Sequence, residues 1–221
     1  MDERREIERA LYLAEQFFSS KRREGNCSLT APIIVDKFQL YWNELRRWNR
    51  KIRIVGDTEE FPIRHLADSL MALPLLYGDR LAILDFGSGG GFPGLPLAVI
   101  LSEAQFFLAE PNNKKASFLR HLVRILSLDN VQIRTSFLRG DPKSEGLSET
   151  FDRLVFRAVE PRTVLSLAPR YLRDKGELLY WGLRGSPPID TTCDNIFLIE
   201  ALEYTLVGSR RFSIFRYKVR R

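Results

Sequence analysis

A glycine-rich segment in the middle of the chain has the composition of a loop that meets a ligand with its backbone. Residues 84–97, LDFGSGGGFPGLPL, hold five of the 14 glycines, with Gly87, Gly89 and Gly91 at alternate positions. Glycine permits tight turns and a close approach of the backbone to a ligand. Glu110 stands 19 residues after Gly91, at the end of the next apolar run. An acid in that place accepts hydrogen bonds from ribose hydroxyls in nucleotide-binding folds, so the sequence predicts a nucleoside site.

The spacing of the glycines excludes two common phosphate-binding loops. The dinucleotide fingerprint requires a glycine three residues after Gly89, where Phe92 stands, and the triphosphate loop requires a lysine directly after its last glycine, whereas the next lysine is Lys114. Three alternating glycines remain, introduced by Asp85 and with Ser88 between the first two. Two prolines follow and are expected to stiffen the loop, which reduces the entropy lost when a ligand binds.

The apolar pattern divides the chain into a helical part, residues 1–78, and an α/β part, residues 79–221, which we expect to form one compact unit. Helical spacing predicts helices at 2–24, 32–51 and 57–76, the last one bent or ended by Pro74. Short apolar runs then alternate with helical segments, as in a parallel sheet. The expected strands are 81–86, 104–110, 131–137, 151–159 and 176–183, and the expected helices are 94–102, 114–128 and 161–173. Two further runs, 197–208 and 210–220, predict an antiparallel hairpin that finishes the sheet.

Charge and composition favour a polyanionic partner and exclude several other classes of protein. The net charge is +6, and residues 203–221 carry six basic groups and one acid, while residues 1–56 carry twelve basic and eight acidic groups. Such a distribution favours nucleic acid, with a solvated basic surface as the alternative. The chain has no apolar run long enough for a membrane span and no signal-peptide pattern near residue 1, so we expect a cytoplasmic protein. The two cysteines, Cys27 and Cys193, are expected to be free thiols, and together with the two histidines they predict no metal site.

The glycine loop resembles the S-adenosylmethionine site of Rossmann-like, class I methyltransferases. More narrowly, the chain is similar to the RsmG (GidB) family, bacterial methyltransferases of guanine N7 in 16S ribosomal RNA, over roughly residues 35–185. The FPG-x-P end of the loop is the most specific feature. The other matching segments are WNRKI (48–52), RHLADSL (64–70), NKKASFL (113–119) and FRAV (156–159). The implied fold is α/β, with a mostly parallel central sheet, an antiparallel C-terminal hairpin and a helical N-terminal extension.

The resemblance implies S-adenosyl-L-methionine as the cofactor and assigns residues to it. Glu110 takes the place of the family's acid, usually aspartate, that holds the ribose. Arg157 is expected to hold the cofactor carboxylate or an RNA phosphate, with a buried ion pair as the alternative. Ser136 and Phe137 stand where the family often has an acid near the adenine. The full set of cofactor-binding residues is Asp85, Gly87, Ser88, Gly89, Gly91, Phe92, Glu110, Ser136, Phe137 and Arg157.

The candidates for positioning the reactants come from one predicted helix face and from Arg157. His65, Asp68 and Ser69 share one helix face, and they are expected either to pack over the cofactor loop or to form a polar contact between the helical part and the sheet. We take His65, Asp68 and Arg157 as the positioning candidates. We assign no catalytic base, because guanine N7 carries a free lone pair and attacks a methyl group without first losing a proton.

The implied partner is 16S rRNA, free or within the small ribosomal subunit, with nucleotide 527 as the target if the family role holds. The candidate phosphate contacts are Arg47, Arg50, Lys51, Lys114, Lys115 and Arg184. We expect a monomer. Two alternatives remain open: a class I methyltransferase with another RNA or a small-molecule acceptor, and an RNA-binding protein that has lost catalysis.

Overall fold

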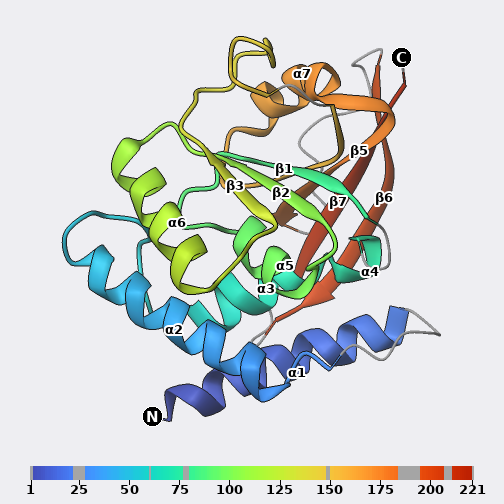
Figure 1. Ribbon diagram of the computed structural model, residues 1–221. Coiled ribbons are helices and arrows are strands. Elements are labelled where there is room, and N and C mark those ends of the chain that lie inside the picture. Colours follow the sequence, from blue (N-terminus) through green and yellow to red (C-terminus); the bar gives the residue numbers. More distant parts are fainter. Residues whose placement is uncertain are drawn as a thin grey trace.

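A seven-stranded sheet with helices on both faces forms the protein (Figure 1). The computed structural model describes residues 2–21, 28–59, 61–76, 80–147, 150–183, 195–206 and 211–220. Both cysteines, Arg184 and the expected hairpin turn lie outside these ranges. None of the helices within them has the length and apolar character needed to cross a membrane.

The sheet has the strand order β3-β2-β1-β4-β5-β7-β6. Its parallel strands are β1 (Ala82–Phe86), β2 (Gln105–Ala109), β3 (Val131–Arg134), β4 (Phe151–Arg157) and β5 (Leu172–Leu183). The last two, β6 (Ile196–Thr205) and β7 (Arg211–Val219), pair antiparallel with each other, and β7 also pairs antiparallel with β5. The expected mostly parallel sheet with an antiparallel C-terminal pair is therefore confirmed. The strand order turns back between β1 and β4, and ligands of open α/β sheets bind at such a point.

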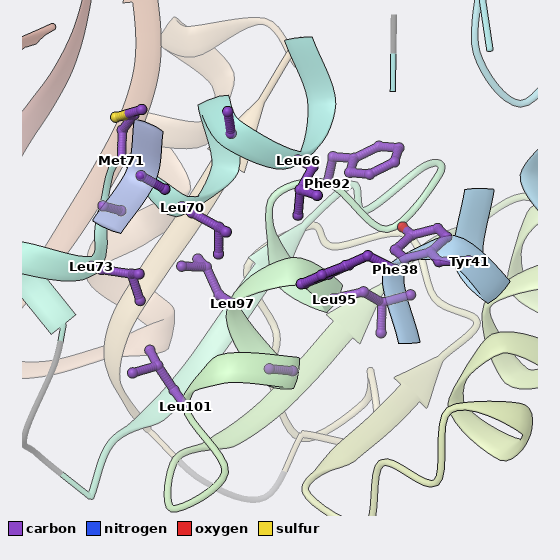
Figure 2. Close-up of a cluster of buried hydrophobic side chains, with 14 of the residues drawn as sticks. Phe38, Tyr41, Leu66, Leu70, Met71, Leu73, Phe92, Leu95, Leu97 and Leu101 are labelled. Carbon is purple, nitrogen blue, oxygen red and sulfur yellow. The ribbon is translucent and has the colours of Figure 1, made fainter. Parts of the chain in front are cut away.

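One face of the sheet carries most of the helices and the larger core. These helices are α1 (Glu3–Lys21), α2 (Pro32–Asn49), η1 (Phe61–Ala67), α3 (Asp68–Leu70), α4 (Leu73–Leu76), α5 (Gly94–Ile100) and α6 (Asn113–Ile125). Their buried side chains form one continuous core with the strands. Figure 2 shows part of this core, where Phe38 and Tyr41 of α2 face Leu95 of α5. Burial of each large apolar side chain contributes about 1.5–3 kcal/mol, so this core holds the helical part firmly on the sheet.

The other face is covered by α7 (Pro161–Tyr171) and by the loop between β3 and β4. Leu138 and Leu147 of this loop are buried together with α7. Glu145 closes the loop, because its carboxylate accepts hydrogen bonds from Arg139 N and from the Tyr171 hydroxyl, at 2.5 and 2.6 Å. Residues 139–147 of the loop are therefore held in a fixed shape against α7.

The segment expected to be a single helix at 57–76 is divided into three. A turn in which Asp57 Oδ1 accepts from Glu59 N precedes it, so the π-helix η1 begins only at Phe61. The chain then leaves helical geometry after Leu70 and resumes it in α4. Pro74 explains the interruption, because proline lacks an N–H and its ring clashes with the carbonyl four residues earlier, which is that of Leu70.

Among the described residues, two strand boundaries differ from the expected ones by three residues or more. The strand expected at 131–137 ends at Arg134, which pairs with Ala109, the last residue of β2, so no partner remains for a longer strand. The strand expected from 176 begins at Leu172, with a register shift near Phe151 and a positive φ of 61° at Lys175. Neither difference changes the carboxyl edge of the sheet, where the candidate site lies.

Candidate functional site

The glycine loop leaves the carboxyl end of β1 and turns back at once toward β2. Gly87 N and Ser88 N both donate to the carbonyl of Ala109 at the end of β2, at 2.9 and 3.0 Å. Pro93 precedes the first residue of α5 and Pro96 lies in its first turn, where a missing N–H leaves no hydrogen bond unmade. The loop is thus joined to β2 at its start and to α5 at its end.

The glycines of the loop serve two different purposes. A Cβ at Gly89 would meet nothing nearer than the Gly87 carbonyl at 3.9 Å, so this residue faces open space. A Cβ at Gly87 would lie 2.8 Å from Val159, and one at Gly91 would lie 2.5 Å from the Tyr41 hydroxyl. Gly87 and Gly91 are therefore required by packing within the protein, and Gly89 leaves room for a ligand.

Asp85 and Ser88 lie inside the loop and support its backbone. The Asp85 side chain is fully buried, and its Oδ2 accepts from Gly94 N at 3.1 Å. Burial raises the pKa of Asp85 from 3.8 to about 7, because the ionised carboxylate loses its hydration. Ser88 is 2% exposed and donates to the Asp85 carbonyl. Both residues fix the shape of the loop from within the protein, and their side chains are almost fully buried.

Glu110 joins the first two strand tips. Its Oε2 accepts from Gly89 N and its Oε1 accepts from Asn112 N, both at 2.8 Å. Asn112 in turn begins α6, because its side chain accepts from the backbone N–H groups of Lys114 and Lys115. Each carboxylate oxygen has a second lone pair, so Glu110 retains the capacity to accept from a hydroxyl donor beside Gly89.

Phe92 packs into a stack of rings beneath the helical layer. Its ring lies parallel to that of Tyr41, with centroids 5.4 Å apart, and to that of His65, with centroids 4.7 Å apart. Phe92 is 5% exposed, and the Arg157 guanidinium lies 5.3 Å from its ring centroid. The Phe92 side chain therefore joins the loop to α2 and η1 and is almost fully buried there.

A polar cluster at the end of β4 brings together the three positioning candidates. Arg157 NH1 donates to Asp68 Oδ2 at 2.8 Å and to the Arg64 carbonyl at 3.0 Å, and NH2 lies 3.0 Å from His65 Nδ1. Because arginine only donates, Nδ1 is the acceptor and the imidazole proton is on Nε2. Burial, reinforced by the charges of Arg157 and Arg64, lowers the pKa of His65 to about 3, so the imidazole is neutral at pH 7.

Asp68 also binds the C-terminal strands. Its Oδ1 accepts from the Tyr204 hydroxyl at 2.6 Å, and its backbone carbonyl accepts from the Trp181 indole at 2.8 Å. Asp68 is 6% exposed, and breaking a buried ion pair from one side typically costs about 3–5 kcal/mol. The ion pair expected as the alternative role of Arg157 is therefore present. Arginine has five N–H donors, and the contacts above use three, so donors remain for an anion.

The residues after β3 present an aromatic ring to solvent. Phe137 is 65% exposed, and the Arg139 guanidinium lies 5.6 Å from its ring centroid. Ser136 beside it is half-buried. The fixed loop described above holds this pair near the tip of β3, two strands from the glycine loop.

Basic side chains flank the glycine loop on two sides. The helices α2 and α6 touch through Trp48, which contacts Phe118 and His121 with ring centroids 5.6 Å apart. Arg50 and Lys51 at the end of α2 are exposed, and the chain that follows them contacts the loop at Gly90. Lys114 is exposed and Lys115 is half-buried at the start of α6, directly after Glu110. Arg47 is exposed and pairs with Glu44 at 3.1 Å.

A cavity of about 360 Å³ adjoins the polar cluster on the side of β5. Its polar wall is formed by η1, α3 and the end of β4, and its apolar wall by the carboxyl end of β5 and the neighbouring ends of β6 and β7. The polar wall contains Arg64, His65, Asp68 and Arg157, and the apolar wall contains Trp181, Leu183, Tyr204, Leu206 and Phe212.

A family model described as rRNA small subunit methyltransferase G (GidB) matches residues 34–193. The chain belongs to this family. A ribosomal RNA small subunit methyltransferase G from Helicobacter hepaticus is 34% identical over 150 residues, covering 66% of this chain and 80% of that protein. One from Dictyoglomus thermophilum is 34% identical over 172 residues, covering 75% and 70%. The crystal structure of a SAM dependent methyltransferase from Aquifex aeolicus has a TM-score of 0.56 at 18% identity, covering 77% of this chain and 98% of that one, and the likeness establishes the shared fold.

In this member of the GidB family, the predicted cofactor-binding and positioning residues lie at or beside the carboxyl ends of β1 to β4, and the structure adds others. Sequence reasoning missed Tyr41, Trp181 and Tyr204, which hold the loop and the polar cluster. Asp68 and Tyr204 are 136 residues apart in the chain, so no local pattern connects them. Asn112 had a readable signal, since asparagine before a helical segment is a common N-cap.

Proposed function

We propose that this protein transfers a methyl group from S-adenosyl-L-methionine to N7 of a guanine in 16S ribosomal RNA, at nucleotide 527 in the usual bacterial numbering. Membership of the GidB family, together with the fold, identifies an S-adenosylmethionine-dependent methyltransferase of small-subunit rRNA. The observation that most directly supports binding of this cofactor is the meeting of Gly89 and Glu110 at the tips of β1 and β2.

The residues at this edge fit the cofactor. S-adenosylmethionine, when bound, supplies a methyl group on a positively charged sulfur. The backbone at Gly89 is open, since an added Cβ would meet nothing nearer than the Gly87 carbonyl at 3.9 Å, and the cofactor would pass over it there. Glu110 accepts hydrogen bonds from the ribose hydroxyls with its remaining lone pairs, and the exposed ring of Phe137 offers a stacking surface to the adenine. Arg157, at the tip of β4, has donors left for the carboxylate of the methionine part.

The chemistry of the polar cluster supports N7 as the acceptor. The His65 imidazole donates no proton to Arg157 and is too weakly basic, with a pKa of about 3, to remove one from an amino group. Asp68 is held by Arg157 and Tyr204. A guanine N7 requires neither group as a base, because its lone pair is free. The residues of the site then act by aligning nucleophile, methyl and sulfur and by excluding water.

The basic groups beside the loop are suited to hold the RNA. Arg50, Lys51, Lys114 and Lys115 flank the glycine loop, and phosphate contacts of this kind supply most of the affinity for RNA while the base contacts supply specificity. We further propose that the protein acts as a monomer in the cytoplasm, on 16S rRNA or on a small-subunit particle during its assembly.

The test is to map N7-methylguanine in 16S rRNA from a strain that lacks this protein. We expect one N7-methylguanine, at nucleotide 527, to be absent, and the purified protein with S-adenosylmethionine to restore it on rRNA or on small subunits from that strain. Unchanged rRNA methylation in the deletion strain would overturn the proposal. Restoration on subunits but not on free rRNA would identify the particle as the substrate.

A further inference from the structure

The cavity beside the polar cluster lies in line with the proposed cofactor site. Glu110, the carboxylate proposed to bind the ribose, follows β2, and the open Gly89 follows β1. Arg157 is at the end of β4, and these three strands are consecutive neighbours in the sheet. The next strand in the same direction is β5, whose carboxyl end forms one wall of the cavity. Arg157 also belongs to the lining of the cavity, so the cavity directly adjoins the proposed cofactor site.

The apolar wall of the cavity is built from rings whose polar ends are already occupied. The Trp181 N–H and the Tyr204 O–H both donate to Asp68, which fixes these side chains and leaves ring surface to line the cavity. Phe212 stacks on Tyr204 with centroids 5.8 Å apart and ring planes 22° apart. Leu183 lies at the edge of the cavity and is 62% exposed. Flat apolar walls of this kind suit a flat, polarisable ligand.

The polar wall of the cavity carries charged side chains, and two of them are paired with each other. The Arg157 guanidinium is paired with the Asp68 carboxylate, and His65 is held as a neutral acceptor. Arg64, on η1, is exposed at the rim. A cation at the rim suits a phosphate of the chain that carries the ligand, whereas the interior offers rings and one carboxylate.

We propose that this cavity receives the target nucleobase, turned out of the RNA, and that its aromatic walls stabilise the positive charge that the base acquires on methylation. This assignment rests on the proposed function. An enzyme that acts on one base turns it out of its stack into a pocket and stacks it on apolar side chains. The lone pair of N7 forms the new N–CH3 bond, and the electron pair of the breaking S–CH3 bond stays on sulfur. The positive charge moves from sulfur to the purine, and no proton is released.

The faces of aromatic rings attract cations. The walls therefore favour the positively charged, methylated base in addition to favouring a flat ligand. Before transfer the purine is neutral, and after transfer it is a cation between the rings. The rings therefore bind the transition state more tightly than the unmethylated base, which raises kcat.

Leu183→Ala, Phe212→Ala and Phe212→Tyr test the assignment. The Leu183 side chain is largely exposed, so its loss leaves the fold intact, and Ile199→Ala on β6, 46% exposed, is the matched control. We expect kcat/KM for the RNA to fall about 10- to 100-fold in Phe212→Ala and by smaller factors in Leu183→Ala and in Phe212→Tyr, which keeps a ring, with the wild-type value in Ile199→Ala. The Kd for S-adenosylmethionine, from calorimetry, stays within about twofold in all four.

A second readout does not depend on turnover. A 16S rRNA fragment with 6-thioguanosine at the proposed nucleotide is photo-crosslinked to the protein, and the linked peptide is identified by mass spectrometry. We expect it to include residues 181–183 or 211–212. A crosslink confined to α6, or wild-type kcat/KM in both Leu183→Ala and Phe212→Ala, would overturn the cavity assignment while the proposed function stands. Absence of guanine methylation by the wild-type protein would overturn both.

Discussion

Substitution of Gly89 and Gly91 by alanine separates space kept for a ligand from space required by packing. Both residues have positive φ, +57° and +95°, where a side chain costs about 1–2 kcal/mol. The reduced freedom of the unfolded chain offsets about 0.4–1 kcal/mol of this. At Gly89 no further cost arises, because the new Cβ has only one neighbour, the Gly87 carbonyl at 3.9 Å. We therefore expect Gly89→Ala to lower the free energy of unfolding by about 1 kcal/mol.

Gly91→Ala has two additional costs. The new Cβ would lie 2.5 Å from the Tyr41 hydroxyl and 2.7 Å from Leu95 Cδ1, and overpacking of this kind costs about 1–3 kcal/mol. It would also displace the Tyr41 hydroxyl from the Gly90 carbonyl, to which it donates at 2.5 Å, at about 1 kcal/mol or more. The expected loss is about 3–5 kcal/mol, measured by urea denaturation.

The affinity for the cofactor is expected to fall more in Gly89→Ala than in Gly91→Ala, the reverse of the order expected for stability. Gly89→Ala places a methyl group in the open space over the loop, so we expect the Kd for S-adenosylmethionine to rise tenfold or more, which is about 1.4 kcal/mol. Gly146→Ala is the control for strain alone, since Gly146 has a φ of +73° and no neighbour within 4 Å. A wild-type Kd in Gly89→Ala would refute the idea that the cofactor passes over Gly89. Equal stability of Gly89→Ala and Gly91→Ala would refute the packing role of Gly91.

Three further predictions concern the same edge of the sheet. In Glu110→Gln one carboxylate oxygen becomes an amide nitrogen that cannot accept a backbone N–H, so we expect the Kd for S-adenosylmethionine to rise about tenfold, and an unchanged value from calorimetry would contradict this role. Folded Asp85, with its pKa raised from 3.8 to about 7, keeps a proton that the unfolded chain has lost between these values, so the wild-type free energy of unfolding falls as pH rises through that window. Asp85→Asn removes this dependence, and urea denaturation at pH 5 and pH 8 compares the slopes. Replacement of both Lys114 and Lys115 by alanine lowers the slope of log K for rRNA against log salt by about 0.7–0.9 per lost contact, measured by filter binding, whereas Lys143→Ala, exposed in the loop before β4, leaves it unchanged.

The fold and the loop could be predicted from the sequence because their signals are local. Residues 81–86 form a short apolar run followed by glycines, and this is sufficient to predict a buried strand and a turn. Pro74 likewise signals a break in a helix, although the position of the break depends on the carbonyl with which the ring clashes. The type and spacing of Gly89 and Glu110 place them at neighbouring strand tips.

The reason for each glycine and the contacts of Asp68 could not be predicted, because they depend on the tertiary structure. The sequence interpretation gives all the alternating glycines the same role, yet Gly91 is excluded from carrying a side chain by Tyr41, which lies 50 residues earlier in the chain. The single face shared by His65 and Asp68 indicates a polar contact but not its partner. That partner, Arg157, is 89 residues from Asp68, and the direction of its side chain follows only from the packing of η1 on the sheet.

The hydrogen bonds of Asp68 have a consequence for the order in which the protein is made. Asp68 is joined to Arg157, Trp181 and Tyr204, which follow it by 89, 113 and 136 residues. A ribosome delivers a chain from its N-terminus at about 5–20 residues per second, so Asp68 emerges several seconds before Tyr204. During that interval the carboxylate lacks the hydroxyl that holds it, and β5 lacks β7 along one edge. The helices that cover the site are thus synthesised before β5 and β6, and the polar cluster is completed only after Tyr204 has emerged.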